Sequence, residues 1–383
     1  MANWIKKIFN KEEKEPTPKF GTMSIHETDW KLAQKMLKNP PSQNAVEELE
    51  KFAKNYLSAK AVYAFGQEPL DVLFGLLPEG SIVVAPAFIH KNASEAMEYN
   101  GLKIKWLDIE LESFGPDLEE LTTTIEDGAN ALFLPYYLGI PSNYLKEIVA
   151  LCEANNVLLI EDCRQAPGAL FDNKPLGSFG DLAIFSFNAM MPINAMQGGM
   201  IAIKRDEYFS ERIKKIQAEA PTSTLTQKEI IEAFIDFYED RKIPDKGLLD
   251  IKHGNKRWEK KWTFSESKTT KIYPAQAVLA KIQFEQVENF AYYRQNHLRL
   301  WQSIAEENNW LTPKPIPISA PGWLRAPVLV PERDHEKAKH LEENPEIGRW
   351  YCEASLPQGI DLDLFPNTKR ATQEMFLFPT EMG

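Results

Sequence analysis

Residues 157–203 read VLLIEDCRQAPGALFDNKPLGSFGDLAIFSFNAMMPINAMQGGMIAI, and this stretch decides the fold. Three apolar runs in it have the length and composition of buried strands, at 157–160, 182–187 and 200–203. The first run leads directly into Glu161 and Asp162, and the second includes Ser186. Because open α/β sheets bind ligands at the carboxyl ends of their strands, these polar side chains are candidates for a binding site.

The same alternation of helix and strand extends on both sides of this stretch. Helices are expected at 46–57, 69–77 and 143–154, and strands at 61–65, 81–85, 103–107, 131–134 and 326–330. This order predicts an α/β fold with a mostly parallel sheet that helices cover on both faces. We expect an N-terminal arm and linker over 1–45 and a large α/β domain over 46–210. A helical region and a smaller α+β C-terminal domain are expected over 211–383.

Composition and charge restrict the class of protein. The chain has 383 residues, of which 43% are hydrophobic and 26% charged, so an ordinary globular fold is expected. Its formal net charge of −11 repels phosphate backbones and argues against nucleic acid as a partner. The three cysteines, Cys152, Cys163 and Cys352, suggest neither a disulfide framework nor a metal site, which favours a cytoplasmic location.

The N-terminal segment leaves two interpretations open. Residues 4–9 read WIKKIF, an amphipathic pattern that fits a peripheral membrane contact. It also fits a frayed helix or a helix docked on another subunit. Residues 11–21 are charged and contain proline, as in a solvated linker. The sequence has no apolar run long enough to span a bilayer.

Three segments of 157–203 resemble motifs of the DegT/DnrJ/EryC1/StrS aminotransferase family. IEDCRQAPGA is similar to the family pattern IEDaAqAlGa, GSFGDLAIFSF to GsfGdigvfSF, and QGGMIAI to eGGmivt. Weaker similarity covers most of the chain from about residue 46. The resemblance implies a pyridoxal phosphate (PLP) enzyme of fold type I, which transfers an amino group to a nucleotide-linked ketosugar. It also implies a site built at a subunit boundary.

The resemblance assigns cofactor contacts to several residues. Asp162 would bind the pyridinium nitrogen, Gln165 the ring face or the 3-hydroxyl, and Ser186 the phosphate. From the residue types alone, Asp162 also fits a cap at a strand end, and Ser186 a local hydrogen bond to the backbone.

The lysine that holds PLP in the family has no counterpart in this chain. The family pattern SFhptKnittgeGG, aligned on its SF and GG pairs, places Met191 at the lysine. There is no lysine anywhere between Ser186 and Gly198, so a shift in the alignment does not supply one. A thioether forms no imine and carries no proton, and loss of a positioned base alone costs about 10²–10⁴-fold in rate.

The predicted phosphate loop also departs from the family pattern. The family reads SGTaA where residues 65–69 read FGQEP. Gly66 and Gln67 are the remaining candidates for contacts to the phosphate. Glu68 adds a negative charge beside the expected phosphate, and Pro69 has no N–H to donate.

Two further positions bear on the site. His90 stands where the family has an aromatic residue against the ring, and it is either a cofactor contact or base, or a packed histidine. Thr269 aligns with the asparagine that a partner subunit sends to the phosphate.

The residues therefore support two hypotheses. In the first, the chain is a diverged, non-catalytic member that binds PLP or pyridoxamine phosphate (PMP) weakly and without a covalent bond, or not at all. It would form a homodimer, or a heterodimer with a lysine-bearing paralogue. In the second, it is an active PLP- or PMP-dependent enzyme on a nucleotide-linked ketosugar, with a base other than lysine. Family membership alone does not separate the two.

Overall fold

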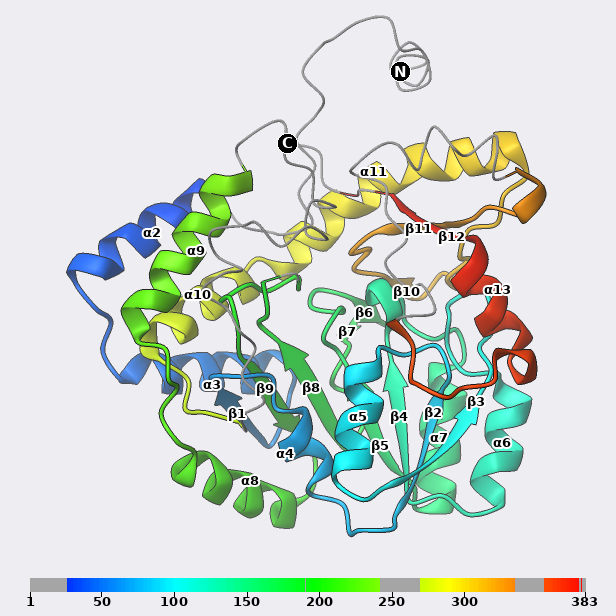
Figure 1. Cartoon of the computed structure of the whole chain (residues 1–383), viewed down its shortest axis with the longest axis horizontal. Coiled ribbons are helices and arrows are strands. Elements are labelled where there is room, and N and C mark those ends of the chain that lie inside the picture. Colours follow the sequence, from blue (N-terminus) through cyan, green and yellow to red (C-terminus); the bar gives the residue numbers. More distant parts are fainter. Residues whose placement is uncertain (1–25, 190, 242–268, 335–354, 379, 381–383) are drawn as a thin grey trace, which may run out of the picture.

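The computed structural model describes residues 26–189, 191–241, 269–334, 355–378 and 380. The amphipathic segment at 4–9, the linker at 11–21 and Cys352 lie outside these residues. Figure 1 shows a central sheet surrounded by helices, with a smaller unit beside one edge.

A seven-stranded sheet forms the centre of the molecule, in the order β1-β9-β8-β5-β4-β2-β3. Its strands are β1 (Ala61–Phe65), β2 (Ile82–Pro86), β3 (Lys103–Leu107), β4 (Ala131–Pro135), β5 (Leu158–Asp162), β8 (Leu182–Ser186) and β9 (Gly199–Ile203). Five neighbouring strands, β3 to β8, are parallel, while β9 runs antiparallel to both β8 and β1. The prediction of a mostly parallel sheet is confirmed.

Helices cover both faces of this sheet. One face packs against α3 (Asn44–Tyr56), α6 (Leu118–Glu126), α7 (Leu145–Asn155) and α10 (Pro274–Phe284). The other face packs against α4 (Leu70–Phe74), α5 (Lys91–Tyr99) and α8 (Glu207–Glu219). All residues of β4, β8 and β9 are buried, which explains why these strands are apolar throughout rather than alternating.

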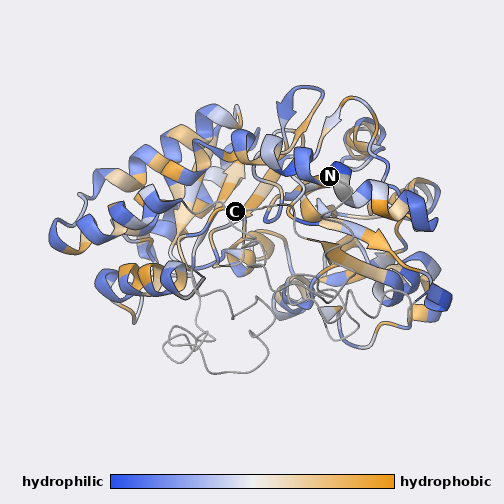
Figure 2. Cartoon of the chain, turned by 90° about the horizontal axis from the view of Figure 1, so that it is seen from above, coloured by the Kyte–Doolittle hydropathy of each residue, from blue (hydrophilic) through white to orange (hydrophobic). Residues whose placement is uncertain are grey.

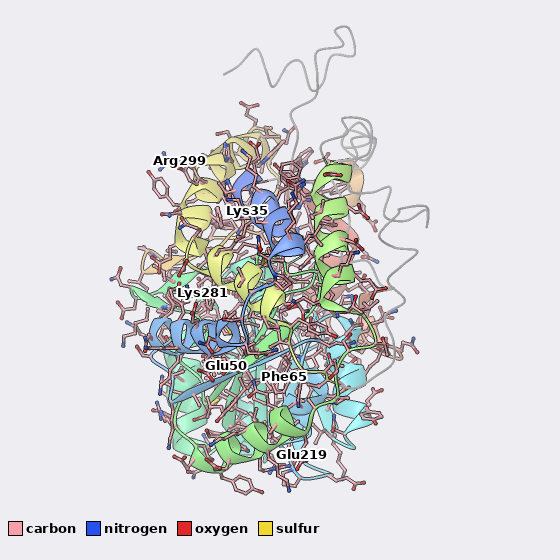
Figure 3. The ribbon with its side chains drawn as sticks, turned by 90° about the vertical axis from the view of Figure 1, so that its left-hand side faces the viewer. Lys35, Glu50, Phe65, Glu219, Lys281 and Arg299 are labelled. Carbon is pink, nitrogen blue, oxygen red and sulfur yellow. The ribbon has the colours of Figure 1, made fainter. Side chains whose placement is uncertain are left out.

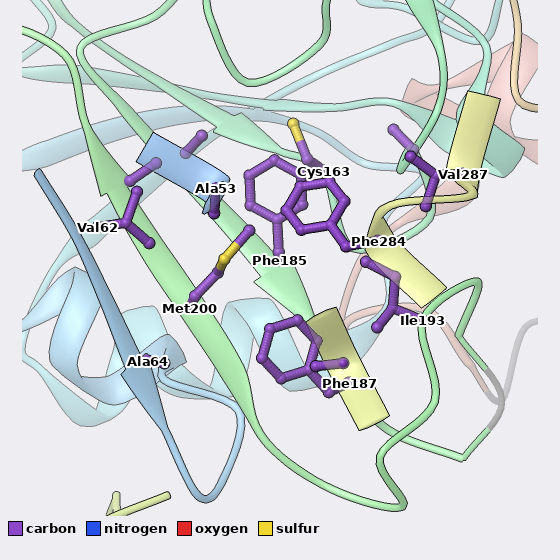
Figure 4. Close-up of a cluster of buried hydrophobic side chains, with 14 of the residues drawn as sticks. Ala53, Val62, Ala64, Cys163, Phe185, Phe187, Ile193, Met200, Phe284 and Val287 are labelled. Atoms are coloured by element: carbon purple, nitrogen blue, oxygen red, sulfur yellow. The ribbon is translucent and has the colours of Figure 1, made fainter. Parts of the chain in front are cut away.

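The first of these faces holds the larger hydrophobic core. In Figure 4, Phe185 of β8 and Met200 of β9 lie in one cluster with Ala53 of α3 and Phe284 of α10. Coloured by hydropathy, the strands are largely apolar, and the helices around them carry hydrophilic residues (Figure 2). Two-sided burial of this kind fixes both the order of the strands and the position of their carboxyl ends.

Two helices lie outside the layer that contacts the sheet. Helix α2 (Glu27–Lys38) packs on α9 (Gln227–Arg241) and on α10. The N-cap of α2 is His26, whose backbone N–H donates to the Asp29 carboxylate at 2.9 Å. Helix α2 falls within the part predicted to be an arm and linker, and the domain boundaries themselves stay a prediction.

A second hydrophobic core lies in the C-terminal part of the chain. It contains α11 (Val287–Asn308), β11 (Ala326–Leu329), α13 (Pro366–Glu374) and β12 (Met375–Phe378). Strands β11 and β12 pair antiparallel, and Trp301 and Phe378 pack with ring centroids 4.5 Å apart. Phe88 and Tyr137, from loops of the large sheet, join the same core.

Short elements complete the described chain. They are the three strands β6 (Leu170–Phe171), β7 (Lys174–Pro175) and β10 (Ser319–Ala320), and the 3₁₀ turns η1 (Tyr137–Gly139), η4 (Glu332–Asp334) and η6 (Leu362–Leu364). The hairpin between β6 and β7 turns at Asp172 and Asn173, whose φ angles of 50° and 59° match a type I′ turn. The two-residue strands were not predicted, because they are too short to show a period. No helix among the described residues has the length and apolar character needed to cross a membrane.

Candidate functional site

A cavity of about 130 Å³ opens at the carboxyl ends of the parallel strands. Five residues singled out from the sequence line it: Glu68, His90, Asp162, Gln165 and Met191. None of the described residues that line it is a lysine. Met191 and Asp162 thus line the same cavity, and the assignment of Met191 to the lysine position stays a prediction.

Arg164 engages both oxygens of the Asp162 carboxylate. Its Nε donates to Asp162 Oδ1 at 2.8 Å, and its Nη2 donates to Oδ2 at 2.7 Å. The backbone N–H of Arg164 also donates to Oδ1, at 3.1 Å. A planar guanidinium matches a carboxylate in this two-point manner, which makes the pair both strong and directional.

Glu68 joins the same cluster from a loop far away in the sequence. Its Oε1 accepts from Arg164 Nη1 at 2.8 Å. Its Oε2 accepts from the Ser186 hydroxyl at 2.6 Å and from Asn188 Nδ2 at 2.7 Å. The hydroxyl of Ser186, predicted to bind a phosphate, therefore donates to a carboxylate of the same chain.

The cluster is nearly closed to solvent. The side chains of Asp162, Arg164 and Glu68 are only 8%, 11% and 13% exposed. Burial by itself lowers the pKa of the Arg164 guanidinium, but the charges of Asp162 and Glu68 outweigh burial and raise that pKa above its ordinary value. Arg164 therefore stays charged across the accessible pH range and keeps both carboxylates paired.

The loop that contains Gly66 and Gln67 is held by the chain itself. The Gly66 N–H donates to the Thr270 carbonyl at 2.7 Å, and Gln276 Nε2 donates to the Gly66 carbonyl at 3.3 Å. A Cβ on Gly66 would lie 2.7 Å from the Thr270 hydroxyl oxygen, so only glycine allows this approach. Gln67 and Thr269 are half-buried, and neither of them lines the cavity.

Gln165 supports a strained turn beside the cavity. Its side-chain Oε1 accepts from the Leu138 N–H at 2.8 Å. Leu138 has φ 55° and ψ 19°, in the left-handed region that leucine seldom adopts. The predicted cofactor contact of Gln165 remains untested, and its observed bond stabilises the turn after β4.

His90 also has a structural role in addition to lining the cavity. It is the N-cap of α5, and its Nδ1 accepts from the Asn92 N–H at 3.3 Å. Burial lowers the pKa of His90, and the charge of Arg164 lowers it further, so the imidazole is neutral at pH 7. A neutral imidazole is able to accept a proton, as a base must.

Glu161, next to the cluster, is buried and structural. Its carboxylate accepts from the Tyr136 hydroxyl at 2.7 Å and from three backbone N–H groups of the loop before β8, those of Gly177, Phe179 and Gly180. It holds that loop against β5. Of these two adjacent acids, Asp162 lines the cavity and Glu161 does not.

Sequence reasoning missed the role of Arg164. A signal was present, since the family pattern IEDaAqAlGa has alanine at the position where this chain has arginine. Glu68 was noted only for its charge, and its position among Arg164, Ser186 and Asn188 could not be read from the sequence.

A model of the DegT/DnrJ/EryC1/StrS aminotransferase family matches residues 25–349, which is most of the chain. The chain belongs to this family. The predicted fold is confirmed with it, since solved structures of the family share the arrangement over almost the whole length.

Two curated relatives illustrate the range of the DegT/DnrJ/EryC1/StrS family. The chain is 30% identical over 152 residues to GDP-4-keto-6-deoxy-D-mannose 3-dehydratase of Escherichia coli O55:H7, covering 40% of the chain and 39% of that protein. It is 28% identical over 136 residues to GDP-perosamine synthase of Escherichia coli O157:H7, covering 36% and 37%. The chain thus spans about two fifths of the length of each relative. Both names refer to GDP-linked sugars.

Solved structures extend the similarity of the fold to nearly the full length. The Escherichia coli GDP-4-keto-6-deoxy-D-mannose-3-dehydratase with bound hydrated PLP has a TM-score of 0.70 at 16% identity, over 95% of each chain. The aminotransferase TlmJ from Streptoalloteichus hindustanus also has a TM-score of 0.70, at 17% identity, over 94% of this chain and 93% of its own. At these identities the likeness concerns the fold alone.

The residues present in this member of the family do not fit PLP. The two oxygens of Asp162 are held by Arg164, and the Ser186 hydroxyl is held by Glu68. The cavity of about 130 Å³ is smaller than the roughly 300–1,000 Å³ of typical small-molecule sites. Met191 in the wall forms no imine, and the Ser186 hydroxyl, the predicted phosphate contact, is already bonded to Glu68.

Proposed function

We propose that this chain is a non-catalytic member of the DegT/DnrJ/EryC1/StrS family, a binding or regulatory protein of nucleotide-sugar metabolism. One observation carries the proposal: Met191, which the motif alignment sets at the Schiff-base lysine, lines the cavity, and no described lining residue supplies an amine. Without an amine the chain has no group that captures PLP covalently and then moves a proton. Its ligand would be a nucleotide-linked sugar, in line with the names of its relatives.

The proposal extends to the cofactor and the location of the protein. PLP or PMP would bind weakly and without a covalent bond, or not at all, because Glu68 and Arg164 hold the groups that would contact it. A cytoplasmic location is in keeping with Cys152 and Cys163, which are buried thiols without a disulfide.

A cofactor experiment tests the absence of a covalent adduct. The purified protein is incubated with PLP, reduced with borohydride, digested and analysed by mass spectrometry. We expect no PLP-modified peptide from any lysine near the cavity. A lysine-bearing member of the family, treated in the same way, is the positive control. A stoichiometric adduct on this chain would refute the proposal.

Binding of the sugar nucleotide is measured separately. Calorimetry with GDP-, dTDP- and UDP-linked sugars should detect binding of at least one class, while glutamate and the corresponding ketosugars give no turnover. Turnover at a rate typical of the family would contradict the proposal. The absence of binding to every nucleotide sugar would contradict the assigned ligand.

One observation favours a second candidate function. His90 lines the same cavity, is neutral at pH 7 and could act as a base in place of lysine. On this alternative the chain is an active PLP- or PMP-dependent enzyme, an aminotransferase or a dehydratase of a ketosugar. PMP-dependent turnover that His90→Asn abolishes would favour this candidate over the first.

A further inference from the structure

Glu68, Asp162, Arg164, Ser186 and Asn188 form a largely buried polar cluster, at the place where the resemblance to the family puts the cofactor. We propose that the side chains of Glu68 and Arg164 take the place of the cofactor. They keep the folded protein stable, and the site closed to solvent, without any cofactor. The inference rests on the proposed function in one respect, since both describe a chain without resident PLP.

The two side chains reproduce the charges of the group they replace. Arg164 offers a cationic N–H donor to Asp162, as a protonated ring nitrogen would, at distances of 2.7 and 2.8 Å. Glu68 offers an anionic acceptor to Ser186 and Asn188, as a phosphate would, at 2.6 and 2.7 Å. Each buried polar group of the cluster is thus satisfied by a partner of the charge it requires.

A bond between the two occupants joins the halves of the cluster. Arg164 Nη1 donates to Glu68 Oε1 at 2.8 Å. Removal of Arg164 leaves the Asp162 and Glu68 carboxylates without a cationic partner, which is a costly state, whereas removal of Glu68 leaves Arg164 paired with Asp162 alone. A phosphate that entered the site would have to displace the Glu68 carboxylate or lie in contact with it. Two negative charges in contact repel each other.

The backbone holds Glu68 in this position. Gly199 opens β9 directly opposite Ser186, the last residue of β8. A Cβ on Gly199 would lie 2.7 Å from Pro69 Cδ and 3.5 Å from Glu68 Cα, so the loop packs directly on this glycine. Pro69 then precedes α4, which begins at Leu70. The carboxylate of Glu68 is therefore delivered by a packed loop and not by a mobile surface chain.

The first experiment removes both occupants and measures the binding of PMP. PMP is the probe because its amine does not form imines with surface lysines. We expect the intact protein to show no binding in calorimetry. Glu68→Ser/Arg164→Ala should bind PMP at least about tenfold more tightly, with a thermal midpoint that rises as PMP is added. The control is Arg205→Ala, which breaks an exposed ion pair with Glu153 and should leave PMP binding unchanged.

Equal affinity of the intact protein and the double variant for PMP would overturn the inference. Failure of the proposed function looks different, as a borohydride-fixed PLP adduct or turnover by the intact protein. The two results are therefore separable.

A second measurement keeps the inference testable if the double variant does not fold. Urea unfolding of Glu68→Gln, of Arg164→Gln and of their combination forms a double-mutant cycle. Because both substitutions break the same buried pair, the combined loss of stability should be clearly smaller than the sum of the single losses. Simple additivity would show that the two side chains do not act as a unit, and would overturn the inference.

Discussion

At the scale of single residues, two positions separate this chain most clearly from the family patterns. Met191 lies in the wall of the cavity where the lysine is expected. Arg164 stands where the family pattern has alanine, and it holds the Asp162 carboxylate at 2.7 and 2.8 Å. The first change removes the amine that the family pattern has, and the second engages the carboxylate predicted to bind the cofactor, so both support the proposed function.

Met191→Lys alone should not restore efficient transamination. In this variant Glu68 would still accept from the Ser186 hydroxyl, and Arg164 would still pair with Asp162. Neither Ser186 nor Asp162 would therefore be available to the cofactor. Two charge-assisted hydrogen bonds denied to the cofactor, each worth roughly 1.5–3 kcal/mol, correspond to a loss of about 10²–10⁴-fold in affinity. The test is turnover with glutamate and a panel of nucleotide ketosugars over a range of PLP concentrations.

Turnover typical of the family at low PLP would show that lysine loss alone separates this protein from active relatives. The matched comparison adds Met191→Lys to Glu68→Ser/Arg164→Ala. In that background we expect PLP to form a reducible imine at lower concentration than in the single variant.

At the scale of elements, half-buried polar side chains tie helices to the strands that position the cluster. Glu50 of α3 accepts from the Ala64 N–H of β1 at 2.9 Å and from Gln217 Nε2 of α8 at 2.6 Å. Figure 3 labels Glu50 beside the end of β1, together with Phe65 and with Glu219 at the end of α8. One carboxylate therefore joins three elements around the strand that leads to Glu68.

Glu50→Ala should lower the free energy of unfolding by about 1–3 kcal/mol, because it leaves the Ala64 N–H of β1 without its acceptor. Gln217 Nε2 of α8 would lose one of its two acceptors and keep the Ala64 carbonyl. Urea unfolding measures the change. Glu48→Ala, on the exposed side of the same helix, is the control and should change stability by no more than about 0.5 kcal/mol. Equal effects of the two substitutions would mean that the link between α3, β1 and α8 contributes little.

His90, the N-cap of α5, should make the free energy of unfolding depend on pH. Its folded pKa is lowered from 6.5, so the unfolded chain binds the proton more readily. Stability is therefore full above about pH 6.5 and falls as the pH drops below this value. Protonation of Nδ1 also removes the acceptor for the Asn92 N–H and puts a positive charge at a helix N-terminus.

His90→Asn keeps an N-cap acceptor without the titration. Urea unfolding between pH 7.5 and 5.5 should therefore show a smaller loss of stability in the variant than in the natural protein. Identical pH dependence in both proteins would show that His90 does not titrate differently on folding.

At the scale of the whole molecule, two hydrophobic cores meet around the cavity. Phe88 and Tyr137 line the cavity and belong to the core of the C-terminal part, while Asp162 and Arg164 extend from the large sheet. The site thus depends on the packing of both parts. Its resemblance to a family whose sites lie at subunit boundaries leads to a prediction about assembly.

The protein should form a dimer, either with itself or with a lysine-bearing paralogue. Light scattering at micromolar concentration should give about twice the chain mass of 43.8 kDa, or the sum of the two masses when the paralogue is co-expressed. A single species with the mass of one chain, both alone and with the paralogue, would refute the prediction. The physical reason is that a site built from residues of two subunits keeps its shape only while the interface between the subunits is intact.

The sequence by itself determined the sheet and the absence of the lysine. Strands buried on both faces are apolar throughout, so β4, β8 and β9 were visible as short uninterrupted runs. Asp162 and Ser186 could be placed at one edge because parallel neighbouring strands end on the same side. The missing lysine is a matter of residue identity and needs no structure.

Only the tertiary structure decided what fills the cavity. Glu68 lies 96 residues from Arg164 and 118 from Ser186 along the chain, and no local pattern links such positions. They meet because β1 pairs with β9, and β9 pairs with β8, which brings the loop after β1 to the end of β8. Glu68, noted in the sequence for its negative charge, is thus brought to Arg164 and Ser186 by the order of the strands.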